Sequence, residues 1–121
     1  MHNFKELEIW KRSRILVKDI YLLISNFPRD EKFGLISQMK RAVVSIPSNI
    51  AEGSGRSSDK EFVRFLDIAI GSAFELETQL YLALDLSFIS NKELNNILFK
   101  ITEIEKMIHG FKKKLMTQSK I

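Results

Sequence analysis

The sequence predicts an all-α protein, an antiparallel up-down four-helix bundle formed by one domain over residues 1–121. Apolar residues recur every three or four positions along four long segments, which is the spacing of amphipathic helices. Short connections separate the segments, so consecutive helices are expected to pack as antiparallel neighbours. The chain of 121 residues is 45% hydrophobic and contains five Gly and two Pro, a composition that suits one compact helical domain.

The first helix is expected to begin at an Asn3 cap and to end at Phe27-Pro28. An Asn side chain can accept a hydrogen bond from an unpaired amide of the first turn, and the residue before a proline disfavours helical geometry. The predicted apolar stripe of this helix contains Leu7, Trp10, Val17, Tyr21 and Ile24, and it is widened by Leu16, Ile20, Leu23 and Phe27.

The second helix is predicted from an Asp30 cap to about Glu52, with Pro47 inside it. An interior proline removes one backbone donor and crowds the carbonyl of Val43, which costs about 3 kcal/mol. Because hydroxyl and amide side chains surround Pro47, we predict a kinked but continuous helix, and a break at residues 44–46 is the alternative. A turn at residues 53–57 follows, and a phosphate-binding loop at its glycines is a second interpretation.

The third and fourth helices each begin with the pattern of a capping box, Ser58 with Glu61 and Ser90 with Glu93. Gly71 lies in the middle of the third helix, where glycine costs about 1 kcal/mol relative to alanine. We therefore predict that another helix backbone approaches closely there, with a tolerated surface glycine as the alternative. The fourth helix carries a coiled-coil-like seam of Ile97, Ile101, Ile104, Ile108, Phe111 and Leu115.

Several functional classes lack the residues that they require. The chain has no cysteine, which excludes disulfides, zinc-cysteine sites and thiol catalysis. Its two histidines, His2 and His109, form no Glu-x-x-His pair, and no Gly-x-Ser-x-Gly elbow occurs. We therefore expect no catalytic residues, no metal site, no cofactor and no enzyme activity. A charged N-terminal segment and the lack of an apolar run of about 20 residues predict a cytoplasmic protein with no membrane partner.

A polar stripe runs along the second helix beside its apolar face and continues on the third helix. A buried stripe would be a structural network in which Arg41 pairs with Glu52 or Glu75, because an unpaired buried charge is costly. A stripe that lines a cleft would instead bind a small polar ligand. The residues of this predicted network are Gln38, Arg41, Ser45, Asn49, Glu52 and Glu75.

The formal net charge of +4 is unevenly distributed. Residues 57–89 hold two basic and six acidic side chains, whereas residues 90–121 hold seven basic and three acidic ones. Solvated helix faces explain such a pattern, and an anion-binding surface is the functional interpretation. If the first and last helices are neighbours, their cationic lines form one patch that contacts phosphates. The residues predicted for this patch are Lys11, Arg12, Arg14, Lys18, Lys106, Lys112 and Lys113.

The segment from Ser45 to Gly53 reads Ser-Ile-Pro-Ser-Asn-Ile-Ala-Glu-Gly. Such a long run of particular residues is specific enough to indicate a protein family. Further residues of the same pattern are Phe4, Leu7, Trp10, Phe27, Pro28, Glu31, Gly34, Leu35, Gln38, Arg41, Ala42, Arg56, Phe65, Leu66, Ala69, Gly71, Ser72 and the run from Glu75 to Leu80. Over most of its length the chain resembles the bacterial four-helix-bundle proteins encoded in intervening sequences of 23S ribosomal RNA genes. It departs from their pattern at Phe33, where Tyr is expected, and at Lys11-Arg12, which adds basic charge.

The resemblance implies a protomer that assembles with itself into a homopentamer. It also implies kinship with the accessory proteins of diversity-generating retroelements, which bind nucleic acid and a reverse transcriptase, and it implies no known catalysis. Ile9, Ile15, Leu22 and Phe99 lie off the main apolar stripes, so we expect a homo-oligomer interface to bury them.

We expect a non-enzymatic, homo-oligomeric helical scaffold that binds RNA or DNA through phosphate contacts on a basic surface. A protein-interaction adaptor with no nucleic-acid role is the alternative. An enzyme whose cleft is lined by the polar stripe is a third hypothesis.

Overall fold

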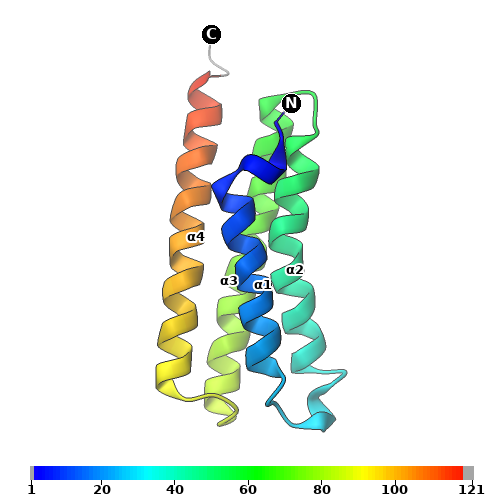
Figure 1. Ribbon diagram of the computed structural model, residues 1–121, viewed down its shortest axis with the longest axis vertical. Helices are drawn as coiled ribbons and strands as arrows, with labels where there is room; N and C mark the ends of the chain where they lie inside the picture. The colour runs from blue at the N-terminus through cyan, green and yellow to red at the C-terminus, as the bar shows by residue number, and fades with distance from the viewer. Residues whose placement is uncertain (1, 119–121) are drawn as a thin grey trace.

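The computed structural model describes residues 2–118, and its four long helices confirm the predicted up-down bundle (Figure 1). The helices are α1 (Glu8–Ile24), α2 (Leu35–Ser54), α3 (Asp59–Asp85) and α4 (Asn91–Gln118). Two short 3-10 helices, η1 (Phe4–Glu6) and η2 (Arg29–Glu31), precede α1 and α2. Each long helix runs antiparallel to the one before it (Figure 1). Helices that follow one another in the sequence also pack against each other.

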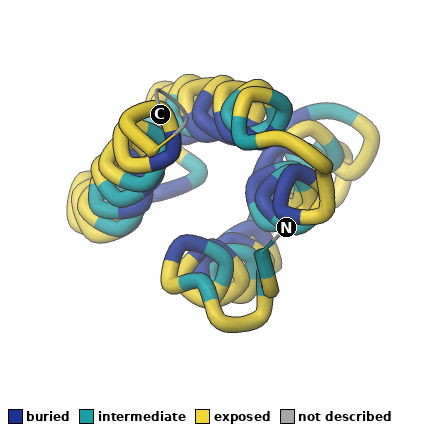
Figure 2. The backbone as a smooth tube through the Cα atoms, turned by 90° about the horizontal axis from the view of Figure 1, so that it is seen from above, coloured by how far each residue is buried: buried dark blue, intermediate teal, exposed yellow. Residues whose placement is uncertain are grey.

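The helices surround one hydrophobic core, and the buried side of each faces its neighbours (Figure 2). The contact between α2 and α3 is the most extensive of those between the long helices, and the contact between α1 and α4 is the least extensive. No helix within residues 2–118 is long and apolar enough to cross a lipid bilayer. The largest fully buried side chains are Phe62, Leu16, Ile20, Met39, Ile46, Ile50, Leu66, Leu76, Leu80, Ile101, Ile108 and Leu115.

The starts of α1 and α2 differ from the sequence prediction. Asn3 accepts a hydrogen bond from the amide two residues later at 3.2 Å, so it caps η1 and not α1. Asp30 lies inside η2, and α2 begins at Leu35, whose amide donates to Oε1 of Glu31 at 3.3 Å. Both differences have one cause, since a polar residue that satisfies unpaired amides can start a short 3-10 turn as well as an α-helix.

Helix α2 passes through Pro47 without interruption, so the predicted continuity is confirmed and the break at residues 44–46 is ruled out, while the kink stays a prediction. Nδ2 of Asn49 donates to the backbone oxygen of Ser45 and to its Oγ, both at 2.8 Å. On α3, Oγ of Ser72 donates to the same Ser45 hydroxyl at 2.8 Å. These side chains therefore bridge the turn that contains the proline and join it to α3.

Both predicted capping boxes are present, and one of them is complete. The Ser90 hydroxyl accepts from the Glu93 amide at 3.1 Å, while the Ser90 amide donates to the Glu93 carboxylate at 2.9 Å. At the start of α3, the Ser58 hydroxyl accepts from the Glu61 amide at 3.2 Å, but the Glu61 carboxylate faces the hydroxyl of Ser57 instead. The sequence pattern therefore located both helix starts correctly.

Helix α3 ends in a turn that the sequence pattern did not reveal. Ser87 has a φ of 65°, a left-handed conformation that glycine usually adopts. The Ser87 amide donates to the Leu84 carbonyl at 2.9 Å and the Phe88 amide to the Ala83 carbonyl at 2.8 Å, which are the two bonds of a Schellman motif. The ring of Phe88 packs against that of Phe27 with a centroid distance of 5.3 Å. This ring contact helps to hold the turn without a glycine.

The close approach between helices occurs at Gly53 and not at Gly71. A Cβ on Gly53 would lie 2.7 Å from Cβ of Phe65 and 2.8 Å from Cδ1 of Phe62. Gly71 is exposed, and nothing lies within 4 Å of the position that its Cβ would take. The predicted close approach at Gly71 is therefore wrong, and the surface-glycine alternative is confirmed.

Candidate nucleic-acid interface

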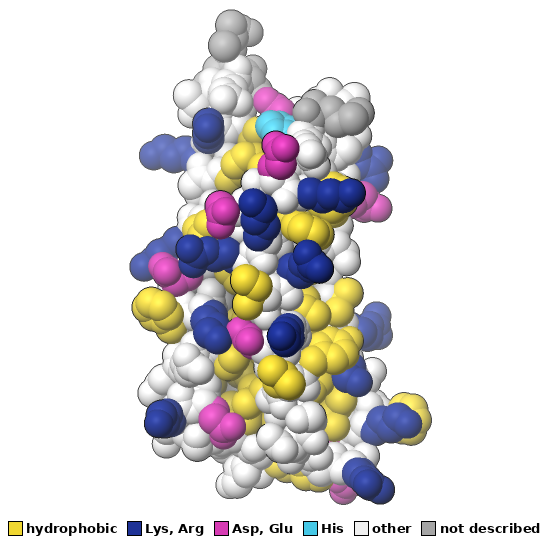
Figure 3. All heavy atoms as spheres, in the orientation of Figure 1, with side chains coloured by type: hydrophobic (Ala, Val, Ile, Leu, Met, Phe, Trp, Pro, Cys, Tyr) yellow, Lys and Arg dark blue, Asp and Glu magenta, His cyan; other side chains and the backbone are white. Residues whose placement is uncertain are grey.

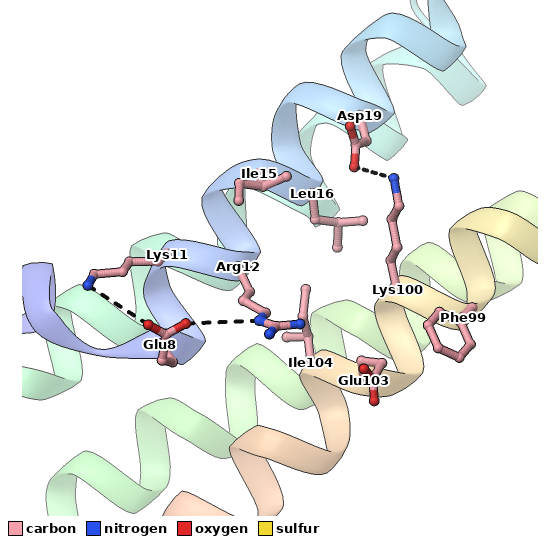
Figure 4. Close-up of a pocket in the computed structure, with 10 residues that line it drawn as sticks. All are labelled: Glu8, Lys11, Arg12, Ile15, Leu16, Asp19, Phe99, Lys100, Glu103 and Ile104. Atoms are coloured by element: carbon pink, nitrogen blue, oxygen red, sulfur yellow. Dashed lines mark hydrogen bonds and ion pairs between the residues drawn. The ribbon is translucent and has the colours of Figure 1, made fainter.

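The seven predicted cationic side chains do not form one patch. Helices α1 and α4 are neighbours, as the prediction required, yet only Lys11 and Arg12 of the seven line the groove between them (Figure 4). On the face of the molecule that contains this groove, positive and negative side chains are interspersed (Figure 3). This seam groove has a volume of about 460 Å³ and is lined by Glu8, Lys11, Arg12, Ile15, Leu16, Asp19, Phe99, Lys100, Glu103 and Ile104.

Carboxylates already pair with the cations of the seam groove. Glu8 is 3.9 Å from Lys11 and 4.0 Å from Arg12, both on its own helix. Lys100 of α4 reaches across to Asp19 of α1 at 2.9 Å (Figure 4). A phosphate would have to compete with these carboxylates for the same cations, so the seam groove suits a charge-balanced partner better than a polyanion.

Apolar side chains beside the seam groove differ in exposure. Ile15, Leu22 and Phe99 are 59%, 61% and 69% exposed, as expected for residues that lie off the core stripes. Ile9 is only 4% exposed, so it belongs to the core of the protomer, and the expectation that an oligomer interface buries it is wrong.

The three predicted lysines of α4, Lys106, Lys112 and Lys113, do not line the seam groove with the cations of α1. Nζ of Lys112 is 2.6 Å from the Asp67 carboxylate, which places this side chain toward α3. Lys113 follows by one residue, a rotation of about 100° that carries it further from the side of Lys100 and α1. Lys106 lies one heptad before Lys113 and shares its exposed face. The predicted patch is therefore divided among different sides of the bundle.

A second groove, at the junction of α1 and α2, has cations as its only charged lining residues. It has a volume of about 530 Å³ and is lined by Tyr21, Ile24, Ser25, Phe27, Arg29, Lys32, Ile36 and Lys40. We call it the basic groove. Nζ of Lys40 lies 5.1 Å from the centroid of the Tyr21 ring, so a cation of α2 is positioned over an aromatic ring of α1. Basic side chains also gather at the lower right of Figure 3, where α1 connects to α2.

Arg14 and Lys18 continue the basic groove along α1. They precede Tyr21 by seven and three residues, so the three side chains lie on one face of the helix. The guanidinium of Arg14 stacks 5.5 Å from the ring centroid of Trp10. Both cations are exposed. Two of the seven predicted residues thus lie beside three cations that sequence reasoning missed.

The predicted polar network lies along a solvent-open groove between α2 and α3. This polar groove has a volume of about 630 Å³ and is lined by Gln38, Arg41, Ala42, Ser45, Ser72, Glu75, Thr78, Gln79 and Leu82. Of the six predicted network residues, only Ser45 and Asn49 are bonded to each other. Glu52 pairs with Arg56 at 3.8 Å, and not with Arg41.

Exposure decides between the two interpretations of this stripe. Gln38, Arg41 and Glu75 are exposed, and Arg41 forms no ion pair within the described part of the chain. Within the protomer the stripe is therefore not buried, and the described residues do not form the predicted pairing of Arg41 with Glu52 or Glu75. The alternative, a stripe that lines a cleft, agrees with the polar groove, whose walls carry hydroxyl, amide, guanidinium and carboxylate groups. Gln79 at its base is 4% exposed, and its Oε1 has no hydrogen-bond partner.

The comparisons with known proteins are consistent with this fold. A sequence profile of the 23S rRNA-intervening sequence protein family matches residues 5–110. The chain belongs to this family. A crystal structure of a protein of unknown function from the S23 ribosomal protein family of Bacteroides thetaiotaomicron has a TM-score of 0.77 and 27% sequence identity with it. The similarity covers 87% of this chain and 98% of that one. No curated protein matches the chain.

One acidic contact between α3 and α4 was not anticipated from the sequence. Glu105 of α4 is 9% exposed, and its Oε2 has no hydrogen-bond partner. Burial, a hydrogen bond with Glu77 of α3 and the charge of that carboxylate together raise the pKa of Glu105 from 4.5 to about 8, and burial is the largest of the three causes. The sequence signal was present, because Glu105 stands four residues after Ile101 in the apolar seam.

The Glu77 and Glu105 contact lines none of the three grooves defined above. Across residues 2–118, no group of three or more His, Cys, Asp or Glu side chains is arranged to hold a metal ion. Among the three grooves, the basic groove is the surface that best suits a polyanion, because its only charged lining residues are cations.

Proposed function

We propose that this protein is a non-enzymatic, homo-oligomeric scaffold that binds RNA or DNA through phosphate contacts. The observation that carries the proposal is the basic groove, whose charged lining consists of Arg29, Lys32 and Lys40 with no carboxylate. Phosphate oxygens are attracted to such a surface, and no carboxylate among its lining residues competes for the three cations. Contacts of this kind do not depend on base sequence. Arg14 and Lys18 extend the contact along α1.

Replacing the three cations of the groove tests this function. The triple variant Arg29→Gln, Lys32→Gln and Lys40→Gln should raise the Kd for a structured RNA about tenfold at about 100 mM salt. It should also make the negative slope of log K against log salt shallower by about 2 to 3, because each lost phosphate contact reduces its magnitude by about 0.7 to 0.9. Filter binding over a salt series measures both quantities.

A matched control carries the same change in charge at Lys92, Lys106 and Lys113, which are exposed on α4. We expect this control to bind nearly as the native protein does. Equal losses in the two triple variants would show that net charge and not the basic groove determines binding. No binding of the native protein to RNA or DNA at about 50 mM salt, where phosphate contacts are strongest, would remove the proposed function.

The seam groove supports the self-association part of the proposal. Its exposed Ile15 and Phe99 leave apolar area in water, and its balanced acids and bases are complementary to a second copy of the same surface. Ile15→Glu and Phe99→Glu should each reduce the mass measured by light scattering on a sizing column. Their melting temperatures should stay within a few degrees of the native value, because both side chains are exposed in the protomer.

Leu86→Glu provides the control for self-association, since Leu86 is 55% exposed and lies at the end of α3. An unchanged mass in both groove variants, or an equal decrease in the control, would contradict an interface at the seam groove. Membership of the family is compatible with the homopentamer that the sequence resemblance implied.

The alternative function is a protein-interaction adaptor, and the apolar base of the seam groove is the feature that favours it. Kinship with accessory proteins of diversity-generating retroelements would make a reverse transcriptase one such partner. A pull-down that survives nuclease treatment supports the adaptor, whereas a pull-down that nuclease abolishes supports the nucleic-acid scaffold.

A further inference from the structure

Phe33 is the most exposed large apolar side chain among the described residues, at 89%. It stands in the connection between η2 and α2, directly after Lys32 of the basic groove. Nζ of Lys32 lies 5.6 Å from the centroid of the Phe33 ring. An aromatic ring therefore projects into solvent beside the cations that would contact phosphates.

Hydrogen bonds fix the backbone that presents this ring. The Lys32 amide donates to the Arg29 carbonyl at 3.1 Å, and the Gly34 amide donates to the Glu31 carbonyl at 3.1 Å. The Glu31 carboxylate in turn accepts from the first amide of α2. Phe33 is thus held on a bonded turn, so its exposure is a property of the fold.

Tyr21 supplies a second ring on the same surface. Its side chain is 41% exposed and lines the basic groove, with Lys40 over one side of the ring. Aromatic rings interleaved with cations are the arrangement that binds single strands, because unpaired bases stack on the rings while the cations follow the phosphates. The bases of a duplex are already stacked on each other, so these rings offer a duplex no comparable contact.

We propose that the basic groove binds single-stranded nucleic acid in preference to duplex, with an unpaired base stacked on Phe33. This proposal rests on the proposed nucleic-acid function and adds the class of strand that is bound. The cations provide attraction to any phosphate chain, whereas the rings provide the discrimination between strands.

Fluorescence anisotropy tests the proposal with a labelled 12-nucleotide oligoadenylate and with a 12-base-pair RNA duplex. Phe33→Ala should weaken oligoadenylate binding by about fivefold or more, and should leave duplex binding within about twofold, because loss of one stacking contact affects only unpaired bases. Phe33→Trp should restore the affinity, and oligoadenylate should quench the fluorescence that this tryptophan adds to that of Trp10. Phe74→Ala is the control, since Phe74 is 51% exposed on α3 and lines none of the three grooves.

The outcomes separate the strand preference from the proposed function. Equal loss of both probes in Phe33→Ala, or no loss of either, would overturn the preference for single strands while RNA binding itself remained. A Phe33→Ala variant that changes only the mass on a sizing column would identify the ring as a protein contact and would also overturn it. Failure of the native protein to bind either probe would instead reject the nucleic-acid function.

Discussion

Gly53→Ala is expected to lower the free energy of unfolding by about 2 to 3 kcal/mol, in spite of the higher helix propensity of alanine. The added methyl group would lie 2.7 Å from Cβ of Phe65 and 2.8 Å from the ring of Phe62. A Cβ atom is fixed to the backbone and cannot rotate away, so α2 and α3, which form the most extensive contact between the long helices, would have to move apart at Gly53. Urea unfolding followed by circular dichroism measures the loss.

Gly71→Ala is the matched control for this prediction, because Gly71 is also helical but nothing lies within 4 Å of its Cβ position. It should stabilise the protein by about 0.5 to 1 kcal/mol through helix propensity alone. Equal effects of the two substitutions would mean that α2 and α3 do not approach as closely at Gly53 as the structure indicates.

Glu105→Gln is expected to stabilise the protein by about 2 to 4 kcal/mol at pH 8.5 and to have little effect near pH 5. Because burial and Glu77 raise the pKa of Glu105 to about 8, the folded state retains its proton where the unfolded state has lost it. The native protein therefore loses stability as the pH rises from about 4.5 to about 8. A glutamine amide stays neutral throughout this range and can still donate to Glu77.

The pH dependence is best measured as a difference between variants, since other groups also titrate over this range. Urea unfolding of the native protein and of Glu105→Gln at several pH values should give curves that separate above pH 5. Glu75→Gln, an exposed carboxylate on α3, is the control and should follow the native curve. Parallel curves for the native protein and Glu105→Gln would show that Glu105 is ionised in the fold near neutral pH.

The fold followed from residues that act within one helix. The Ser58 and Ser90 boxes marked two helix starts, and apolar spacing gave the four segments. The helix starts predicted at Asn3 and Asp30 were wrong, because a capping residue does not determine whether the helix that follows is a short 3-10 turn or a long α-helix. Ser87 gave no signal at all, since its left-handed conformation depends on bonds at the end of α3 and on the ring of Phe88.

The candidate sites depended on contacts between helices, which periodicity does not supply. Lys11 and Arg12 were correctly placed near α4, but the partner of Lys112 is on α3 and Arg41 is exposed. The missed cations lie partly in the connection between α1 and α2, where no helical period relates them to the lysines of α1. The sequence therefore predicted an abundance of exposed cations, and only the structure shows which of them share a surface.

The small contact between α1 and α4 has a consequence for how the bundle folds. The three other interfaces between long helices each join helices that follow one another in the chain. Joining α1 to α4 closes the longest loop of the chain, so the entropy cost of this contact is the largest. The contact is also the least extensive, so it contributes the least stabilisation. We therefore expect α2 and α3 to form the folding nucleus, onto which α1 and α4 then pack. Because most contacts join helices that follow one another in the chain, the contact order is low, which favours rapid folding.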